Sequence, residues 1–338
     1  MERRGFLTAG TWCVDRNLTV DRWPEEDTVA RVTGITLSGG GSGCNFACDI
    51  ALLDPEVPIA TQCIIGEDQN GDFLTDVART HGIEASGMIR VPEAQTMVTD
   101  AYQSAQSGRR THIFTPGTAD HLCPDHFNPA KGDARFFHLG LPGVHPRMDA
   151  PCGDDANGWV TVLRAAQKAG HQTSLELVTI DPARLREIVL PCLPHLTHLV
   201  VNDFEIGALA GIETGTGDDT DIPAVIRAAQ DILARAPLEM VAVHFTKGAI
   251  LIHRDDKTPL LVPSVALSEA DIKGVNGAGD AFAAGLFLGL HRNWSHADSL
   301  RLAHAAAAVS MSALGTYTGM KPAATCLKLA EEKGWRSA

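Results

Sequence analysis

The amino-acid sequence predicts an α/β fold in which helices cover both faces of a mostly parallel central sheet. Short runs rich in β-branched and aromatic residues alternate with helical periodicity along most of the 338 residues. Alternation of this kind is typical of parallel strands joined by crossover helices, which gives a three-layer α/β/α architecture. Residues 15–37 and 96–114 instead alternate polar and apolar residues without a helical period, and predict additional strands.

Each expected element has its own local signal. The strands are short apolar runs bounded by Gly, Pro or acidic residues: 6–13, 59–65, 135–139, 173–178, 198–201 and 239–245. The helices repeat apolar residues every three or four positions: 44–53, 71–81, 158–169, 182–189, 223–235, 278–290 and 295–314. The strands of 15–37 come between the first strand and its helix, so they would project over the carboxyl edge of the sheet, where ligands bind in such folds. We therefore expect one domain over residues 1–338 with a small β-sheet lid.

Composition excludes several classes of protein. The chain is 44% hydrophobic and 20% charged, with a formal net charge of −13, which argues against a nucleic-acid partner because phosphate binding needs a basic surface. The longest apolar run, 281–290, is too short to span a bilayer. Eight cysteines in a chain of this length predict reduced thiols and a cytoplasmic protein with no membrane partner.

The most informative segment is residues 274–282, Gly-Val-Asn-Gly-Ala-Gly-Asp-Ala-Phe, a turn of small residues that opens an apolar helix. The N–H groups of Gly277, Ala278 and Gly279 would have no helical partner and, with the helix dipole, would form an anion pocket. Asp280 beside this pocket could accept the proton of an attacking hydroxyl while the amides hold the charge of a transferring phosphoryl group. The alternative is that Asp280 only complements the helix dipole.

A second glycine-rich segment, residues 38–47, also opens a helix. Its bare backbone allows close approach of a polar ligand, and Asn45 can both donate and accept hydrogen bonds; a flexible hairpin turn is the alternative. No Gly-Lys-Ser/Thr follows, and neither glycine segment completes Gly-x-Gly-x-x-Gly/Ala. Gly-x-Ser-x-Gly fails too, because Cys44 stands at the second glycine. A P-loop, a dinucleotide site and a serine hydrolase all lose their main support.

Taken in order, these segments resemble the ribokinase-like, PfkB-type family of sugar and nucleoside kinases. The resemblance covers nearly the whole chain and rests on the following segments: 10–15, 40–47, Gly66-Glu67-Asp68 with Gly71, 116–118, Asn202-Asp203-Phe204-Glu205, 277–280 and 302–308. It implies a ribokinase-like three-layer fold with a β lid. It also implies ATP as co-substrate, Mg²⁺, and a sugar or ribonucleoside acceptor, with nucleotide binding in residues 200–320.

The resemblance also implies roles for individual residues. Asp280 would be the catalytic base, with the amides of residues 277–279 as anion hole. Asp15, Gly41 and Asn45 would bind acceptor hydroxyls, although Asp15 could equally be a solvated turn residue. Glu205 would organise Mg²⁺ together with Asn202; without the resemblance, Asn-x-x-Glu is an ordinary helix N-cap box.

On the nucleotide side the resemblance places Thr246, Lys247 and Gly248 at the phosphate-facing loop and His304 beside the adenine. A lysine in an exposed turn and a histidine packed on a helix face are the alternatives. Phe245 replaces a glycine of the family pattern. Gly274 replaces an acid that helps to hold a monovalent cation in many members, so the resemblance leaves open whether this chain needs potassium.

The acceptor stays open between a free sugar and a ribonucleoside, since Trp12, Tyr102 and Phe114 could stack on a purine or only pack in the lid. The absence of a Lys or Arg cluster near residues 38–47 disfavours a phosphorylated acceptor. A catalytically silent sensor of sugars or nucleosides on the same fold is the alternative function. A homodimer formed through the lid is a further expectation.

Overall fold

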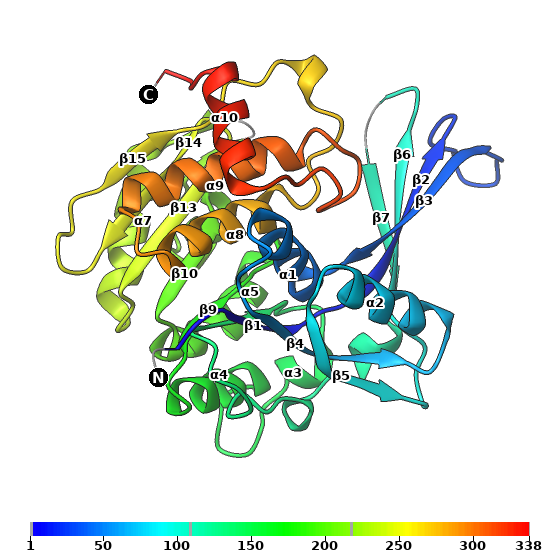
Figure 1. The fold of residues 1–338 in the computed structure, drawn as a ribbon, viewed down its shortest axis with the longest axis horizontal. Coiled ribbons are helices and arrows are strands. Elements are labelled where there is room, and N and C mark those ends of the chain that lie inside the picture. Colours follow the sequence, from blue (N-terminus) through cyan, green and yellow to red (C-terminus); the bar gives the residue numbers. More distant parts are fainter. Residues whose placement is uncertain (1–2, 108–109, 217–218, 338) are drawn as a thin grey trace.

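A large mixed sheet organises the molecule (Figure 1). The computed structural model describes residues 3–107, 110–216 and 219–337. Within them, nine strands form a sheet of order β15-β14-β13-β10-β9-β8-β1-β4-β5. The pairs from β5 to β13 are parallel, and β14 and β15 are antiparallel additions at one edge. The strands are β1 (Phe6–Gly10), β4 (Ile59–Gly66), β5 (Glu84–Val91), β8 (Phe136–Gly140), β9 (Gln172–Leu175), β10 (His198–Asn202), β13 (Met240–Phe245), β14 (Gly248–His253) and β15 (Leu260–Pro263).

Helices cover both faces of this sheet, which confirms the three-layer prediction. Successive strand residues point to opposite faces: Phe6 and Phe136 belong to one buried cluster, and Leu7 and Phe137 to the other. The first cluster packs under α1 (Ser42–Leu53), α2 (Gln69–Thr80), α8 (Ala278–His291), α9 (His296–Ser310) and α10 (Ala323–Lys333). The second packs under α3 (Pro146–Asp149), α4 (Gly158–Lys168), α5 (Pro182–Val189), α6 (Asp203–Ala210) and α7 (Ile222–Arg235).

A separate small sheet projects from the main body, at the upper right of Figure 1. In the described residues it contains four strands in the order β3-β2-β6-β7. They are β2 (Cys13–Val20), β3 (Val32–Gly40), β6 (Val98–Ser104) and β7 (Arg110–Thr115). These strands come from the two stretches in which the sequence predicts a lid, although residues 108–109 lie outside the described residues. A two-stranded ribbon, β11 (Gly215–Thr216) and β12 (Asp219–Thr220), lies beside α6.

Several predicted boundaries were wrong by a few residues. The first strand ends at Gly10, and the chain then enters the small sheet at Cys13. The strand predicted at 173–178 ends at Leu175, and the helix predicted at 295–314 ends at Ser310. The prediction also missed β5, β14, β15, α6 and α10, which are short or lie at an edge of the fold.

No helix within the described ranges is long and apolar enough to cross a bilayer.

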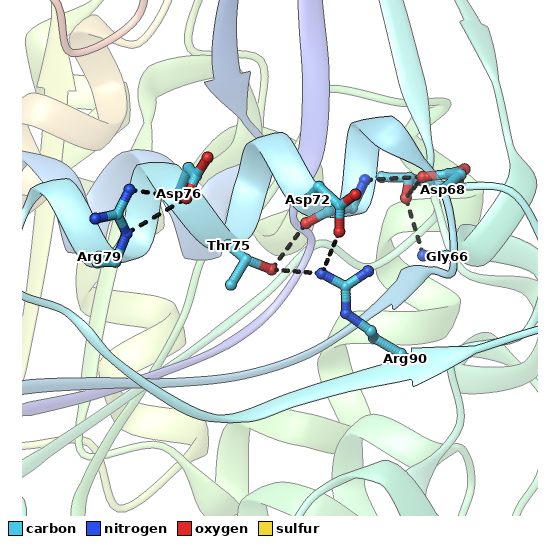
Figure 2. Close-up of polar contacts among 9 residues, drawn as sticks. Gly66, Asp68, Asp72, Thr75, Asp76, Arg79 and Arg90 are labelled. Carbon is cyan, nitrogen blue, oxygen red and sulfur yellow. Dashed lines mark hydrogen bonds and ion pairs between the residues drawn. The ribbon is translucent and has the colours of Figure 1, made fainter.

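Asp68 joins the main sheet to the small sheet. Its carboxylate caps α2 by accepting the N–H of Gly71, and it also accepts the N–H and hydroxyl of Thr96, just before β6. The Thr96 hydroxyl in turn accepts the N–H of Gly66 at the end of β4. Figure 2 shows Asp68 at the start of α2, with the exposed Asp76–Arg79 pair farther along the same helix. The segment 66–71, which belongs to the resemblance, therefore has a structural role.

We expect Asp68→Ala to lower the free energy of unfolding by about 1 to 3 kcal/mol, because it removes a helix cap and leaves a buried hydroxyl without its acceptor. Asp76→Ala, on the same helix, is the matched control: its exposed ion pair contributes roughly 0 to 1 kcal/mol. Urea denaturation of both variants measures the difference. Equal effects of the two substitutions would show that Asp68 does not fasten this junction.

Candidate active site

The N-terminus of α8 lies at the carboxyl edge of the sheet, and Asp280 in its first turn faces a cavity of about 370 Å³. The cavity also contains residues of β2, α1 and the segment after β9, including Asp15, Asn45 and Glu176. The sequence predicted three of these site residues together, Asp280, Asp15 and Asn45, and the structure brings them to one cavity. Gly41 and Glu205 line it as well.

Asn45 holds Asp280 in place from the facing helix. Its side-chain N–H donates to Oδ2 of Asp280 at 3.0 Å, and its carbonyl oxygen accepts the hydroxyl of Thr316 at 2.8 Å. The ionised carboxylate of Asp280 can only accept, so the amide nitrogen of Asn45 faces Asp280 and its carbonyl oxygen faces the Thr316 hydroxyl. One carboxylate oxygen of Asp280 is thereby bound, and Oδ1 makes no side-chain hydrogen bond to a described residue.

Asp15 reaches the cavity because the backbone beneath it is bare. A Cβ on Gly40 would lie 2.2 to 2.3 Å from the atoms of the Asp15 carboxyl group, which is closer than non-bonded atoms can approach. Gly277, at the start of α8, has φ of 75° and lies against Thr316, where a Cβ would come within 2.6 Å of its carbonyl oxygen. Each of the two glycine segments thus has one glycine without which a site residue would have to move.

Acidic groups crowd the cavity, and burial changes their protonation. Burial raises the pKa of Asp280 to about 7, and the charge of Glu176 adds to this, while the hydrogen bond from Asn45 opposes it. Burial likewise raises the pKa of Asp15 to about 7 and of Glu176 to about 8. A base with a pKa near 7 is well matched to proton transfer at neutral pH.

Glu176 has a histidine partner on the neighbouring strand. Its Oε2 lies 3.4 Å from Nε2 of His138, whose Nδ1 is 2.9 Å from the hydroxyl of Ser174. Burial lowers the pKa of His138 to about 4, so we describe this pair as neutral and not as an ion pair.

A second cavity, of about 530 Å³, adjoins the first at the same helix N-terminus. Asn202, His244 and Gly279 line both cavities, and Ala278 lines the second. The N–H groups of Gly277 and Gly279 donate to no backbone carbonyl of the described residues, whereas that of Ala278 donates to Val275 at 3.3 Å. Two ligands, one in each cavity, would therefore meet beside free amides and Asp280.

Asn202 and Glu205 form the capping box of α6 and also line the first cavity. Asn202 accepts the N–H of Glu205 at 2.8 Å, and Glu205 accepts the N–H of Asn202 at 3.0 Å. The other oxygen of Glu205 accepts the hydroxyl of Thr179. Burial raises the pKa of Glu205 to about 7. Within the described ranges no group of three or more His, Cys, Asp or Glu could hold a metal ion. Mg²⁺ keeps several of its waters when it binds to proteins, so one carboxylate such as Glu205 can be enough to hold it.

The residues predicted for the nucleotide divide between two environments. Thr246 lines the second cavity, and so does His304, which is buried with Nε2 3.2 Å from the carbonyl oxygen of Val262. Lys247 instead points to Asp219, at 3.2 Å. Gly248 pairs with Phe245 at the end of the β13–β14 hairpin. Neither Lys247 nor Gly248 lines the second cavity.

The sequence analysis missed three residues that the structure places at the site: Thr316, His244 and Glu176. The signal for His244 and Glu176 was their position, at or just past the carboxyl end of a strand. Thr316 gave no such signal, because it lies in an irregular segment 36 residues beyond Asp280. Trp12 is buried and Tyr102 packs on Trp23, so neither lines the first cavity.

Known proteins resemble this chain along nearly its full length. A ribokinase from Arabidopsis thaliana is 22% identical over 326 residues, 96% of this chain and 80% of that protein. A 1-phosphofructokinase from Rhodobacter capsulatus is 28% identical over 308 residues, 89% of this chain and 87% of that protein. The solved structure of Arabidopsis thaliana ribokinase with ribose and ATP superposes with a TM-score of 0.76 at 20% identity, covering 98% of this chain and 99% of that one.

A family model confirms the family that the sequence analysis predicted. The model described as pfkB family carbohydrate kinase matches residues 6–324, which include every residue predicted for the site. The chain therefore belongs to the pfkB family of carbohydrate kinases.

Proposed function

We propose that the protein transfers the γ-phosphoryl group of ATP to a primary hydroxyl of an unphosphorylated sugar. The observation that carries this proposal is the position of Asp280. It lies where the two cavities adjoin, beside the free amides of α8, with one oxygen held by Asn45. The solved relative with ribose and ATP supports the same pairing of ligands.

In this mechanism Asp280 removes the hydroxyl proton as the oxygen attacks the γ-phosphorus. The bond from that phosphorus to the β-phosphate oxygen breaks, and ADP leaves. The amides of Gly277 and Gly279 donate to the phosphoryl oxygens as charge develops on them. The pKa of Asp280, near 7, lets the carboxylate accept a proton at neutral pH without being too weak a base.

Mg²⁺ fits as a partner of the phosphates rather than of the protein. Glu205, with Asn202 beside it, can hold one water or one coordination position. The ion would neutralise phosphate charge during transfer. Thr246 and His304 would contact the nucleotide in the second cavity, and Lys247 could do so only after leaving Asp219. Gly274, in the segment before α8, has no carboxylate with which to hold a monovalent cation, so the proposed mechanism includes none.

The lining of the first cavity favours a free sugar among the acceptors. It contains hydroxyl, amide and carboxyl groups, and among the described residues it includes no Lys or Arg that could bind a phosphorylated acceptor. It also lacks Phe, Tyr and Trp, on which a purine or pyrimidine would stack. Carboxylates such as Asp15 accept hydrogen bonds from pairs of sugar hydroxyls.

Dimerisation and a cytoplasmic location stay predictions. Ile35, Leu37 and Ile113 are exposed by 62%, 54% and 55% on the face of the small sheet opposite Asp15. This is the surface on which a second copy would pack. Nothing in the described structure favours a silent sensor over an enzyme.

An acceptor panel tests the proposed reaction directly. We expect ADP release with one or more of ribose, fructose and related free sugars. We expect little with adenosine and none with fructose 6-phosphate, since the cavity lacks the groups that would bind a base or a phosphate. A coupled assay for ADP with Mg²⁺ and ATP measures this. A preference for fructose 6-phosphate would contradict the acceptor class, and silence with every acceptor would favour the sensor.

Replacing Asp280 with Asn should lower kcat by roughly 10² to 10⁴, because it removes the positioned base. Acceptor binding should change little, since the amide oxygen introduced by Asp280→Asn can still accept the hydrogen bond from Asn45. Calorimetric binding of the acceptor and steady-state kinetics measure the two effects. Asp76→Asn, an exposed change far from the cavities, is the control and should keep wild-type turnover. Near-normal kcat in the Asp280 variant would contradict its role.

The pH profile should report the raised pKa of the acid cluster. Because an ionised base is needed, kcat/KM should rise with pH to a plateau above an apparent pKa of about 7. Other acids titrate nearby, so this apparent pKa belongs to the acid cluster as a whole and not to Asp280 alone. Glu176 is mostly protonated below its own pKa of about 8, so Glu176→Gln removes only the ionised fraction of this group and should move the midpoint slightly, to lower pH. A profile that stays flat down to about pH 5 would contradict the assignment.

A further inference from the structure

A basic cavity lies at the edge of the sheet opposite the candidate active site. Its volume is about 300 Å³, and it is formed where the chain enters β1, β4 and β8 and where α8 ends. The chain starts on this side, far from the small sheet (Figure 1). Since His291, at the end of α8, is 11 residues beyond Asp280, the cavity lies about 17 Å along the helix from Asp280. The residues lining it are Arg3, Arg4, Asp54, Glu56, Val57, Arg135, His291, Arg292 and Asn293.

Positive charge prevails in this cavity although the chain carries a formal net charge of −13. Among the described lining residues, four are arginines and two are acids. Asp54 is already bound by Arg292, which donates to its Oδ2 through two nitrogens. Glu56 makes no ion pair with a described residue, and with its charge counted the four guanidinium groups still outnumber the two carboxylates.

Several donors in the cavity are fixed and still free to bind a ligand. Arg135 makes its hydrogen bonds to described residues through Nη1 alone, to the carbonyls of Leu290 and His291 and to Asn293. These contacts hold the guanidinium group while Nε and Nη2 keep their protons available. Arg4 makes no hydrogen bond or ion pair within the described part of the chain, so its whole guanidinium group is available.

His291 supplies a neutral donor beside these arginines. Its Nε2 accepts the N–H of Gly5 at 2.8 Å, so the proton of the neutral ring is on Nδ1. Nδ1 is buried and has no partner among the described residues. Burial and the nearby arginines Arg135 and Arg4 lower the pKa of His291, which keeps the ring neutral.

We propose that this cavity is a binding site for a phosphate group, either free or carried by a small metabolite, separate from the proposed active site. Guanidinium forks donate to two oxygens at once and match the oxygen geometry of phosphate. The phosphate would lie against Arg4 and the free edge of Arg135, beside the neutral ring of His291. The size of the cavity leaves room for a sugar attached to the phosphate.

Isothermal titration of inorganic phosphate into the wild-type protein tests this site, with a saturating non-hydrolysable ATP analogue present to occupy the amides of α8. Equal ionic strength is kept with KCl. We expect Arg4→Glu to weaken phosphate binding by about tenfold or more. Arg79→Glu, at another exposed arginine, should bind as the wild type does. A second titration with glucose 6-phosphate distinguishes a free anion from a phosphorylated metabolite by whether its affinity also depends on Arg4.

A second variant tests the site in case Arg4 alone contributes little to the affinity for phosphate. Arg135→Gln should also weaken phosphate binding, and circular dichroism checks that α8 keeps its fold. If both variants bind phosphate with the wild-type affinity, or if KCl alone reproduces the heat, the arginines serve only to hold the end of α8 and the proposal is wrong.

Discussion

The hydrogen bond between Asn45 and Asp280 is the contact on which the proposed chemistry depends. It joins the start of α1 to the start of α8, two helices that are far apart in the sequence. Both helices begin at glycine-rich turns at the carboxyl edge of the same sheet, so their free N–H groups and first-turn side chains meet there. Thr316 binds the carbonyl oxygen of Asn45, whose N–H holds one oxygen of Asp280 and leaves the other available.

Concentrating acids in this cavity costs stability and gives reactivity. Asp15, Glu176, Glu205 and Asp280 all have pKa values raised to about 7 or 8 by burial. Because the unfolded chain ionises these groups at lower pH, the free energy of unfolding falls as pH rises from about 4 to about 8. The same burial makes each carboxyl group a stronger base than in water. A positive metal ion or a sugar's hydroxyl groups would relieve part of this cost.

The small sheet completes the first cavity, and Asp68 is one of its attachments to the main body. Asp15 and Thr99 come from β2 and β6, and Asp68 holds the start of β6 to α2. The acceptor cavity thus depends on a junction that belongs to neither sheet alone. The basic cavity at the opposite edge has no such dependence, since the segments that enter β1, β4 and β8 and the end of α8 line it. One helix therefore contributes to two sites with opposite charge.

The sequence by itself determined the layered architecture, the additional strands of the small sheet and most of the proposed site, because these depend on periodicity, glycine turns and the rule that strand ends gather at one edge. It could not determine edge strands such as β5, whose pattern is weak, nor the ends of elements, which tertiary contacts set. Only the tertiary structure decided that Lys247 faces Asp219, that Thr316 binds Asn45 and that four arginines meet at the far end of α8. These contacts join residues distant along the chain, and local sequence carries no information about which distant side chain will lie opposite.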